Sequence, residues 1–241
     1  VTAQTIFDSS GSIIRLDMSE YMEKHSVSKI IGAPPGYLGF ESGGQLTEAV
    51  RKNPYSLILL DEIEKAHKDI LDILLQLLDD GIITDGQGRT VSFKNSIIVL
   101  TSNLGSQSIN DLSIRNEDTN EIKTIVDVEL KKFFKPEFLN RLDEVVIFKN
   151  LDLNELKKIA IIQLKNLENR LIKKDLKLHI TDAAVEYLIK ESFDNSYGAR
   201  PLKRIFQKEI QTKIANNILN NKYLNKKKVD IFIKDGYLFV D

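Results

Sequence analysis

Cysteine is absent from the 241-residue chain, and histidine is scarce. Without cysteine there are no disulfides, no thiol catalysis and no cysteine-ligated metal site. The three histidines, His25, His67 and His179, lie far apart in the sequence and do not form a zinc-binding pattern. The sequence therefore offers no candidate for a thiol enzyme or for a zinc site.

A long apolar run is also missing, and so is a strong charge of either sign. No apolar run approaches the roughly 20 residues that a membrane-spanning helix needs, and the N-terminal residues do not have the pattern of a signal peptide. The formal net charge of -1 provides no general electrostatic attraction to nucleic acid or to an anionic membrane. We expect a globular protein of the cytoplasm or of an organellar matrix (plastid or mitochondrion), with neither a nucleic-acid nor a membrane partner.

The most informative segment is an apolar run, Leu57–Leu60, that leads directly into Asp61 and Glu62. Its apolar residues do not alternate with polar ones, which is typical of a strand buried on both faces of a helix-covered parallel sheet. Ile13–Leu16, a short apolar run that ends at Asp17, is also predicted to be a strand, and Ser96–Leu100 is predicted to be a second fully apolar strand. In such sheets the ligand site lies at the carboxyl ends of the strands, and the two carboxylates fall there.

The segments between and after these strands predict an α/β fold. Gly32–Gly44 is rich in glycine and proline and is expected to form a loop, and Asp85-Gly86 predicts a turn within a hairpin at Ile82–Phe93. Periodicity predicts the remaining elements: helices at Ser19–Ile31, Leu46–Arg51, Lys68–Asp80 and Val126–Phe134, the last ended by Pro136, and a short strand at Val145–Phe148.

The composition changes near Leu151, where helical periodicity takes over. We predict helices at Asn154–Lys173, Thr181–Lys190 and Arg200–Leu219, followed by a terminal hairpin of Lys228–Ile233 and Tyr237–Val240. The chain is therefore predicted to consist of an α/β domain at residues 1–150 and a mostly helical domain with a short β element at residues 151–241.

Six motifs occur in order along the chain and together resemble a known family. They are Arg15-Leu16-Asp17-Met18-Ser19-Glu20-Tyr21, Gly32-Ala33-Pro34-Pro35-Gly36-Tyr37, Asp61-Glu62, Thr101-Ser102-Asn103, Pro136-Glu137-Phe138-Leu139-Asn140-Arg141 and Tyr197-Gly198-Ala199-Arg200. This arrangement resembles the second AAA+ module of the Clp ATPases, the ClpB, ClpC and ClpA type of ring-shaped protein unfoldase. The resemblance covers essentially the whole chain. It implies an AAA+ large domain with a parallel sheet and flanking helices, followed by the C-terminal small domain of these proteins.

The resemblance implies catalytic roles for two carboxylates and one amide. Asp61 matches the Walker B aspartate, which serves Mg²⁺, and Glu62 matches the glutamate that activates the attacking water. Asn103 matches sensor 1, whose amide contacts the γ-phosphate or holds that water. The alternatives are two solvated carboxylates that follow a core strand, and an asparagine that only forms a turn before Gly105.

Two arginines match residues that contact the phosphates of ATP. Arg141 matches the arginine finger, which in this family acts on ATP bound by the neighbouring subunit. Arg200 matches sensor 2, which reaches from the small domain to the phosphates of its own subunit. The alternatives are a structural ion pair of Arg141 with Asp143 or Glu144, and a plain surface cation at Arg200.

One glycine-rich loop matches the loop that lines the central pore of the Clp rings. Its tyrosine is Tyr37, flanked by Gly36, Leu38 and Gly39. Glycines allow such a loop to move, and an exposed aromatic ring contacts any extended polypeptide through apolar surface. The alternative is a tyrosine that anchors the loop by being buried. The hairpin tip at Gly86–Val91 resembles a second axial loop.

The chain departs from the family in its phosphate-binding segment. The sequence G-x-x-x-x-G-K-[ST] is absent. In the family the residues before Val1 would form the helix that follows this loop, so we expect the chain to be part of a longer ATPase. By itself it is expected to hydrolyse ATP poorly or not at all. The alternative is a protein that has lost its nucleotide site and serves as a non-catalytic ring subunit or adaptor.

The function that the resemblance implies is ATP-driven unfolding or disaggregation of protein clients, which are threaded through a homohexameric ring with ATP and Mg²⁺ as cofactors. Feeding a ClpP-type protease is disfavoured, because residues 106–128 contain no glycine and therefore lack the motif of Ile, Leu or Val followed by Gly-Phe. Leu38-Gly39-Phe40 has that pattern but lies in the pore loop. A DNA-associated AAA+ protein is disfavoured by the near-neutral charge and the pore tyrosine.

Overall fold

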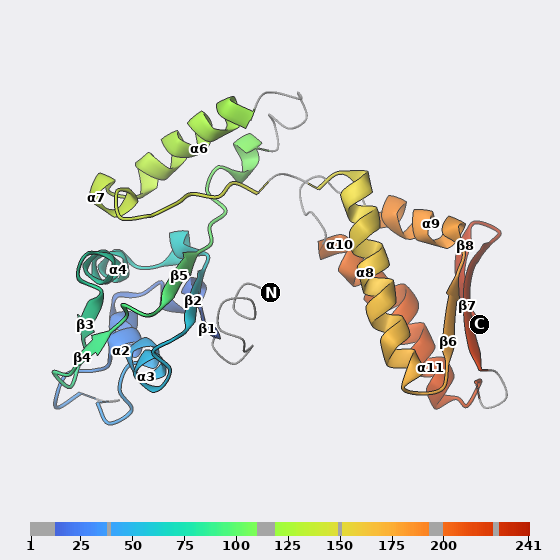
Figure 1. The fold of residues 1–241 in the computed structure, drawn as a ribbon, viewed down its shortest axis with the longest axis horizontal. Helices are drawn as coiled ribbons and strands as arrows, with labels where there is room; N and C mark the ends of the chain where they lie inside the picture. The colour runs from blue at the N-terminus through green and yellow to red at the C-terminus, as the bar shows by residue number, and fades with distance from the viewer. Residues whose placement is uncertain (1–12, 38–39, 110–118, 149–150, 193–199, 224–226) are drawn as a thin grey trace. The chain divides into compact units, whose positions relative to one another are not determined.

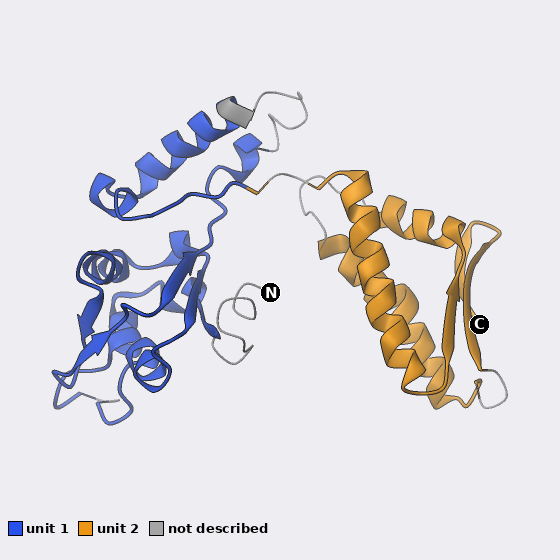
Figure 2. Cartoon of the chain, viewed as in Figure 1, with its two compact units in different colours: residues 1–109, 116–147 blue, residues 110–115, 148–241 orange. Residues whose placement is uncertain are grey.

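The computed structural model describes residues 13–37, 40–109, 119–148, 151–192, 200–223 and 227–241. The chain divides into two compact units (Figure 2): residues 1–109 with 116–147, and residues 110–115 with 148–241. Each unit has its own cluster of buried apolar side chains. Each can therefore be described as a separately packed body.

A three-stranded parallel sheet is the largest sheet among the described residues of the first unit, with α2 (Val27–Ile31), α3 (Gln45–Lys52) and α4 (Lys68–Asp80) beside it (Figure 1). Its strands β1 (Ile13–Asp17), β2 (Leu57–Asp61) and β5 (Ile97–Leu100) lie in the order β1-β2-β5. Neighbouring residues of a strand face opposite sides, and Leu57 and Ile58 are 6% and 0% exposed. The middle strand is thus covered on both faces, and the predicted parallel α/β sheet is confirmed.

Helix α4 and the following hairpin match the prediction closely. Helix α4 (Lys68–Asp80) buries Ile70, Leu74 and Leu77 on one face and ends at Gly81, which adopts a left-handed conformation with φ 67°. The hairpin consists of β3 (Ile82–Thr84) and β4 (Thr90–Ser92). The elements that complete the unit are η1 (Met18–Tyr21), η2 (Lys24–Ser26), α2 (Val27–Ile31), α3 (Gln45–Lys52), η3 (Ile63–Lys65), α6 (Thr119–Phe133) and α7 (Pro136–Leu139).

Two segments of the first unit differ from the prediction. Ser19–Ile31 is not one helix: the 3₁₀ turn η1, capped by the Asp17 carboxylate through the Ser19 N–H (3.0 Å), is followed by Glu23 in an extended conformation with φ −101° and ψ 150°. The chain then restarts as η2 and α2. Val145–Phe148 forms no strand: it pairs with no strand among the described residues, and Phe148 is 85% exposed. A short apolar run without a partner for its backbone does not become a strand.

Helix α6 extends further toward the N-terminus than predicted. It begins at Thr119 rather than near Val126. Ile122 and Val126, one turn apart, are 8% and 5% exposed, so both lie on the buried face of the helix. Pro136 does separate this helix from the next one, where it occupies the first turn of α7, a position that suits a residue without an N–H.

The second unit packs a small sheet against helices (Figure 1). Strand β6 is parallel to β7, and β7 is antiparallel to β8, with Val229 and Ile231 of β7 completely buried on the helix side. The terminal hairpin is confirmed, whereas the strand β6 was not predicted. The elements in chain order are α8 (Leu153–Ile172), β6 (Lys177–Ile180), α9 (Asp182–Ser192), α10 (Arg200–Ile205), η4 (Phe206–Gln211), α11 (Thr212–Leu219), β7 (Lys228–Lys234) and β8 (Tyr237–Val240).

The boundaries of these elements have local causes. Asp152 and Glu155 form a reciprocal capping box at the start of α8, which satisfies two backbone N–H groups that have no partner inside the helix. Helices α10 and α11 are joined through the π-helical segment η4, so the predicted helix at Arg200–Leu219 is essentially confirmed. No helix within the described residues is both long and apolar enough to cross a membrane.

Two glycines of the first unit lie where the backbone of other segments leaves no room for a side chain. A Cβ on Gly86 would lie 2.5 Å from the carbonyl oxygens of both Gly32 and Ala33, and one on Gly44 would lie 2.3 Å from the carbonyl carbon of Ile31. The Gly86 N–H also donates a hydrogen bond to the Ile31 oxygen (2.9 Å). The hairpin turn and the segments around α2 and α3 therefore meet at backbone contact.

We predict that Gly86→Ala lowers the free energy of unfolding of the chain by about 2 kcal/mol or more, because the new methyl group overlaps backbone that cannot rotate away. Gly88→Ala is the matched control. Gly88 has φ 78°, but a Cβ at this position would have no atom within 4 Å, so its cost is confined to about 1 kcal/mol of backbone strain. The measurement is urea unfolding of both variants. A larger loss of unfolding free energy for Gly88→Ala than for Gly86→Ala would contradict the close backbone contact at Gly86.

Candidate functional site

The carboxyl ends of the three parallel strands bring polar side chains to one edge of the sheet. Asp17 at the end of β1 is in register with Asp61 at the end of β2. Thr101 directly follows β5, and its hydroxyl donates a hydrogen bond to Asp61 Oδ1. This is the edge at which parallel α/β sheets bind their ligands.

Asp61 is held from two sides. Arg15, two residues before the end of β1, donates a hydrogen bond from its guanidinium to Asp61 Oδ2 (2.5 Å), while Thr101 contacts Oδ1. The Arg15 side chain is 64% exposed and that of Asp61 27%. An ion pair this exposed contributes little to stability, so its main consequence is to fix the direction of the carboxylate.

Glu62 has an unusual backbone conformation. Its φ and ψ are 55° and 52°, the left-handed region that residues other than glycine rarely occupy. Thr101 supports this turn, because its hydroxyl oxygen accepts a hydrogen bond from the Glu62 N–H (3.2 Å) and its carbonyl accepts one from the Ile63 N–H (3.0 Å). Backbone strain that the surroundings maintain is often found at functional residues. The backbone conformation held by Thr101 therefore sets the direction in which the half-buried Glu62 side chain leaves the chain.

Asn103 lies on the loop that follows β5. Its backbone N–H donates a hydrogen bond to Glu64 Oε1 (3.3 Å), which ties this loop to the turn after Glu62. The other carboxylate oxygen of Glu64 is buried and has no hydrogen-bond partner among the described residues. The structure thus brings three of the predicted residues, Asp61, Glu62 and Asn103, to the same edge of one sheet.

The two arginines lie elsewhere. Arg141 follows α7, is exposed, and forms an ion pair with Asp79 of α4, so the partners predicted for a structural pair, Asp143 and Glu144, were wrong. Asp79 is near the C-terminal end of α4, about 16 Å along the helix from its first residue, whereas Glu62 precedes the other end. Arg200 is the exposed first residue of α10 in the second unit.

Tyr37 is 70% exposed, which contradicts the alternative of a buried anchoring tyrosine. Its N–H donates to the Pro34 carbonyl (3.2 Å), and its own carbonyl accepts from the Phe40 N–H (3.3 Å). Gly36 adopts φ 87° in open space. Leu38 and Gly39, the other two predicted pore-loop residues, lie outside the described residues. The aromatic ring of Tyr37 is available for contact with another molecule.

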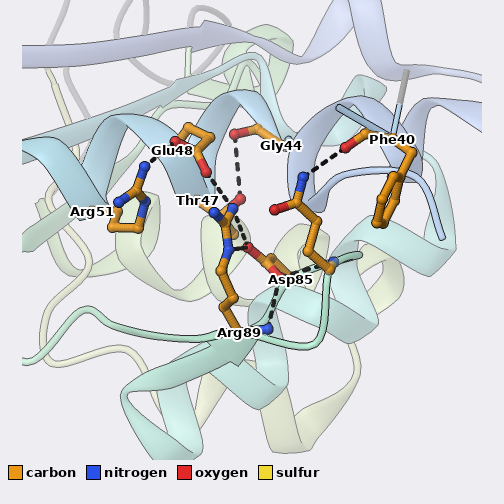
Figure 3. A network of polar contacts seen from close by, with 8 residues as sticks. Phe40, Gly44, Thr47, Glu48, Arg51, Asp85 and Arg89 are labelled. Carbon is orange, nitrogen blue, oxygen red and sulfur yellow. Dashed lines mark hydrogen bonds and ion pairs between the residues drawn. The ribbon is translucent and has the colours of Figure 1, made fainter. Parts of the chain in front are cut away.

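A polar network joins the hairpin turn to helix α3 (Figure 3). The side chain of Asp85 is 1% exposed and accepts hydrogen bonds from the N–H groups of Gln87 and Arg89 (both 2.9 Å) and from Arg89 Nε (2.7 Å). The Arg89 guanidinium also contacts Glu48 of α3, whose other oxygen accepts from Arg51 (2.8 Å). Three charged residues therefore bridge two elements that are far apart in the sequence.

The network shifts the pKa values of its carboxylates. Burial by itself raises the pKa of Asp85, but hydrogen bonds from Arg89 and Gln87, together with the positive charge of Arg89, outweigh burial and lower the pKa below its ordinary value. The hydrogen bond from Arg51 is the largest influence on Glu48, and with Arg89 it lowers the pKa of Glu48 against the effect of burial. Both carboxylates are therefore charged at neutral pH.

Sequence reasoning missed several residues of the sheet edge as individuals. Asp17 is the last residue of β1 and Thr101 directly follows β5, positions comparable to that of Asp61 at the end of β2, so position alone could have found them. Arg15 and Glu64 could not be found in this way, because their contacts with Asp61 and Asn103 join residues more than thirty positions apart. The Asp85 network likewise depends on tertiary contacts.

The described residues contain no group of three or more His, Cys, Asp or Glu side chains that could hold a metal ion. Such a cage is not required for Mg²⁺, which usually binds one or two protein carboxylates and completes its shell with water and substrate phosphates. A single fixed carboxylate at the strand end, Asp61, is the kind of ligand that fits this chemistry. The edge is thus compatible with Mg²⁺ bound mainly by a nucleotide.

The parallel sheet and the polar edge at its strand ends are typical of an AAA domain, and comparison with known proteins agrees. Residues 1–145 match the family described as AAA domain (Cdc48 subfamily), and residues 151–231 match the C-terminal, D2-small domain, of ClpB protein. The chain therefore belongs to the AAA family, of which the Clp-type second module is the subgroup it resembles over its whole length.

Curated relatives with this arrangement are named as ClpB chaperones. The chain is 50% identical to chaperone protein ClpB 1 of Synechocystis sp. over 236 residues, which are 98% of the chain and 26% of that relative. It is 51% identical to chaperone protein ClpB of Bacillus cereus over 239 residues, 99% of the chain and 28% of the relative. The ClpB of Rhodopirellula baltica is 50% identical over 238 residues, covering 99% and 27%. The chain spans about a quarter of the length of these relatives.

We predict that acid weakens the first unit through the Asp85 network. A carboxylate whose pKa is lower in the folded state stabilises the fold above its ordinary pKa, and this contribution is lost as the pH falls below that value, which is 3.8 for Asp85 and 4.5 for Glu48. Asp85→Asn should lower the free energy of unfolding at neutral pH. Between about pH 5 and about pH 3, the free energy of unfolding of this variant should fall less steeply than that of the wild type.

The measurement is urea unfolding of the wild type and Asp85→Asn across this pH range. Asp143→Asn, which removes an exposed carboxylate of the same unit, is the control and should keep the wild-type slope. An Asp85→Asn curve parallel to that of the wild type would show that the Asp85 carboxylate does not titrate differently in the folded state.

Proposed function

We propose that the chain is the motor module of a ClpB-type chaperone, which uses ATP to unfold or disaggregate protein clients by threading them through a homohexameric ring. The observation that carries the proposal is the arrangement of Asp61, Glu62 and Asn103 at the carboxyl edge of the buried sheet. The ClpB names of relatives about 50% identical over nearly the whole chain support it. We assign residues 1–150 to the AAA+ large domain and residues 151–241 to the small domain.

In this proposal the residues of the edge divide the chemistry between them. Asp61 is a ligand of Mg²⁺, which supplies charge neutralisation at the phosphates of ATP. Glu62 accepts a proton from the attacking water, and its imposed backbone conformation favours one approach of its carboxylate. Asn103 donates a neutral hydrogen bond to the γ-phosphate or to the water.

Two neighbours of Asp61 position it. Thr101 keeps one carboxylate oxygen and the Glu62 N–H in a fixed relation, so it maintains the geometry of both acidic residues together. Arg15 contacts the other oxygen, and its exposed guanidinium is free to move away when a cation binds there. We therefore assign Arg15 the task of compensating the Asp61 charge between turnovers.

The two remaining arginines complete the proposed site. Arg141 is exposed and pairs with Asp79, which lies at the end of α4 remote from Glu62. This position suits an arginine finger that acts on ATP bound to a neighbouring subunit better than one that acts within its own subunit. To do so it must exchange its ion pair with Asp79 for the phosphates. Arg200 is assigned to contact the phosphates as sensor 2, an assignment carried by the motif resemblance alone.

Tyr37 is proposed to grip the client. An exposed aromatic side chain on a loop provides apolar contact area that does not depend on the sequence of the bound polypeptide. Gly36, Leu38 and Gly39 are assigned to the same loop. Delivery of clients to a ClpP-type protease remains the disfavoured alternative, and the cellular compartment stays a prediction.

We predict that Tyr37→Ala and Glu62→Gln abolish client unfolding in the hexamer of the complete protein. Glu62→Gln removes the general base and should slow ATP hydrolysis at this module by about 100-fold or more while ATP stays bound. Tyr37→Ala removes the grip and should leave ATP bound and hydrolysed. Unfolding of a fluorescent client protein, measured beside ATP turnover, separates the two effects.

Tyr55→Ala is the matched control, because Tyr55 is a similarly exposed tyrosine (65%) of the same unit outside the pore loop. It should leave client unfolding unchanged. Equal rates of unfolding for Tyr37→Ala, Tyr55→Ala and the wild type would rule out the proposed grip.

A further inference from the structure

The loop that carries Tyr37 and the turn of the β3–β4 hairpin are separated by about fifty residues in the sequence but contact each other at several points. We call residues 32–44 the tyrosine loop and residues 85–89 the hairpin turn. The contacts involve Ile31, the last residue of α2, and the described residues 32–37 and 40–44 of the loop. They fall into three groups, which involve Gly86, Gln87 and Arg89.

The first contact joins the hairpin turn to the base of the tyrosine loop. The Gly86 N–H donates a hydrogen bond to the Ile31 carbonyl (2.9 Å), and a Cβ added to Gly86 would lie 2.5 Å from the carbonyl oxygens of Gly32 and Ala33. Because these are backbone atoms in van der Waals contact, the base of the loop and the turn cannot shift independently by more than a small amount.

The second contact reaches the far side of the tyrosine loop. Gln87 donates a hydrogen bond from Nε2 to the Phe40 carbonyl (2.7 Å), and the same carbonyl accepts the N–H of Gly43 (3.4 Å). Phe40 in turn donates its N–H to the Tyr37 carbonyl (3.3 Å). The side chain of Gln87 is therefore two hydrogen bonds away from Tyr37 itself.

The third contact passes through charged side chains (Figure 3). Arg89 is bound to Asp85 within the turn and to Glu48 on α3. The tyrosine loop packs on the same glutamate, because a Cβ on Gly43 would lie 2.7 Å from Glu48 Cγ. Glu48 is thus a common support for the end of the loop and for the turn.

We propose that Gln87 and Arg89 are positioning residues for Tyr37: they clamp the tyrosine loop to the hairpin turn, so that the two loops move as one body. Tyr37 is exposed and preceded by a glycine in open space, so its own surroundings restrain it little. The restraint comes from the Phe40 carbonyl and from Glu48. A force on Tyr37 is then carried into the hairpin and α3 instead of being lost in bending of the loop.

The significance of this clamp for moving a polypeptide rests on the proposed function, but the clamp itself does not. It can be tested in the 241-residue chain without ATP, partner subunits or client. A negative result would refute the clamp but would not bear on the proposed threading activity. Conversely, a protein that did not thread clients could still contain the clamp.

The test is hydrogen–deuterium exchange of the peptides that cover the tyrosine loop and the hairpin turn, in the wild type and in Gln87→Ala, Arg89→Ala and Arg51→Ala. Gln87→Ala should accelerate exchange in the tyrosine loop about five-fold, the ratio that corresponds to about 1 kcal/mol for one hydrogen bond. Arg89→Ala should accelerate exchange in both segments by about ten-fold or more, because it also leaves the buried Asp85 carboxylate without its partner.

Arg51→Ala is the matched control, since Arg51 binds the same Glu48 side chain but, among the described residues, forms no hydrogen bond or ion pair with the turn or the loop. It should change exchange in both segments less than about two-fold. If Arg89→Ala unfolds the first unit, Gln87→Ala still decides the question. Unchanged exchange of the tyrosine loop in Gln87→Ala, or equal acceleration by Gln87→Ala and Arg51→Ala, would overturn the proposal.

Discussion

The burial of strand β2 on both faces is the constraint on which the rest of the first unit depends. Because Leu57 and Ile58 are both enclosed, the strand can occupy only the middle of the sheet, and its register with β1 and β5 is fixed. That register places Asp61 beside Asp17 and within reach of Thr101. Hydrophobic packing therefore sets the position of Asp61 and of the following Glu62. The hydrogen bonds of Thr101 to the Asp61 carboxylate and to the Glu62 N–H set their orientation.

A second constraint, close backbone packing, connects the sheet to the loops. Gly86 and Gly44 permit contacts that any side chain would prevent, and they bring the hairpin turn to the base of the tyrosine loop. Around this contact the buried Asp85 is stabilised by Arg89, which also reaches Glu48. Apolar packing thus fixes the strands of the sheet, and polar contacts connect the loops of the same unit.

Sequence reasoning succeeded where the signal is local. Apolar runs predicted the three parallel strands, the first of them in spite of Arg15, Asp85-Gly86 predicted the hairpin, and the periodicity of α4 predicted its buried face. It failed where a partner elsewhere in the chain decides the outcome. Val145–Phe148 has strand composition but no pairing strand among the described residues, whereas Lys177–Ile180 becomes a strand because β7 is available to pair with it. The contacts of Arg15, Glu64 and Gln87 are tertiary and leave no local signal.

The central claim is that the Asp61 edge is half of a working nucleotide site. Its most direct test is calorimetric titration of Mg²⁺–ATP into this chain and into a form extended upstream by about thirty residues, enough for a phosphate-binding loop and its strand. The account predicts binding by the extended form only, weakened at least about ten-fold by Asp61→Asn. Absence of binding by both forms, or binding indifferent to Asp61→Asn, would contradict it and favour a non-catalytic ring subunit.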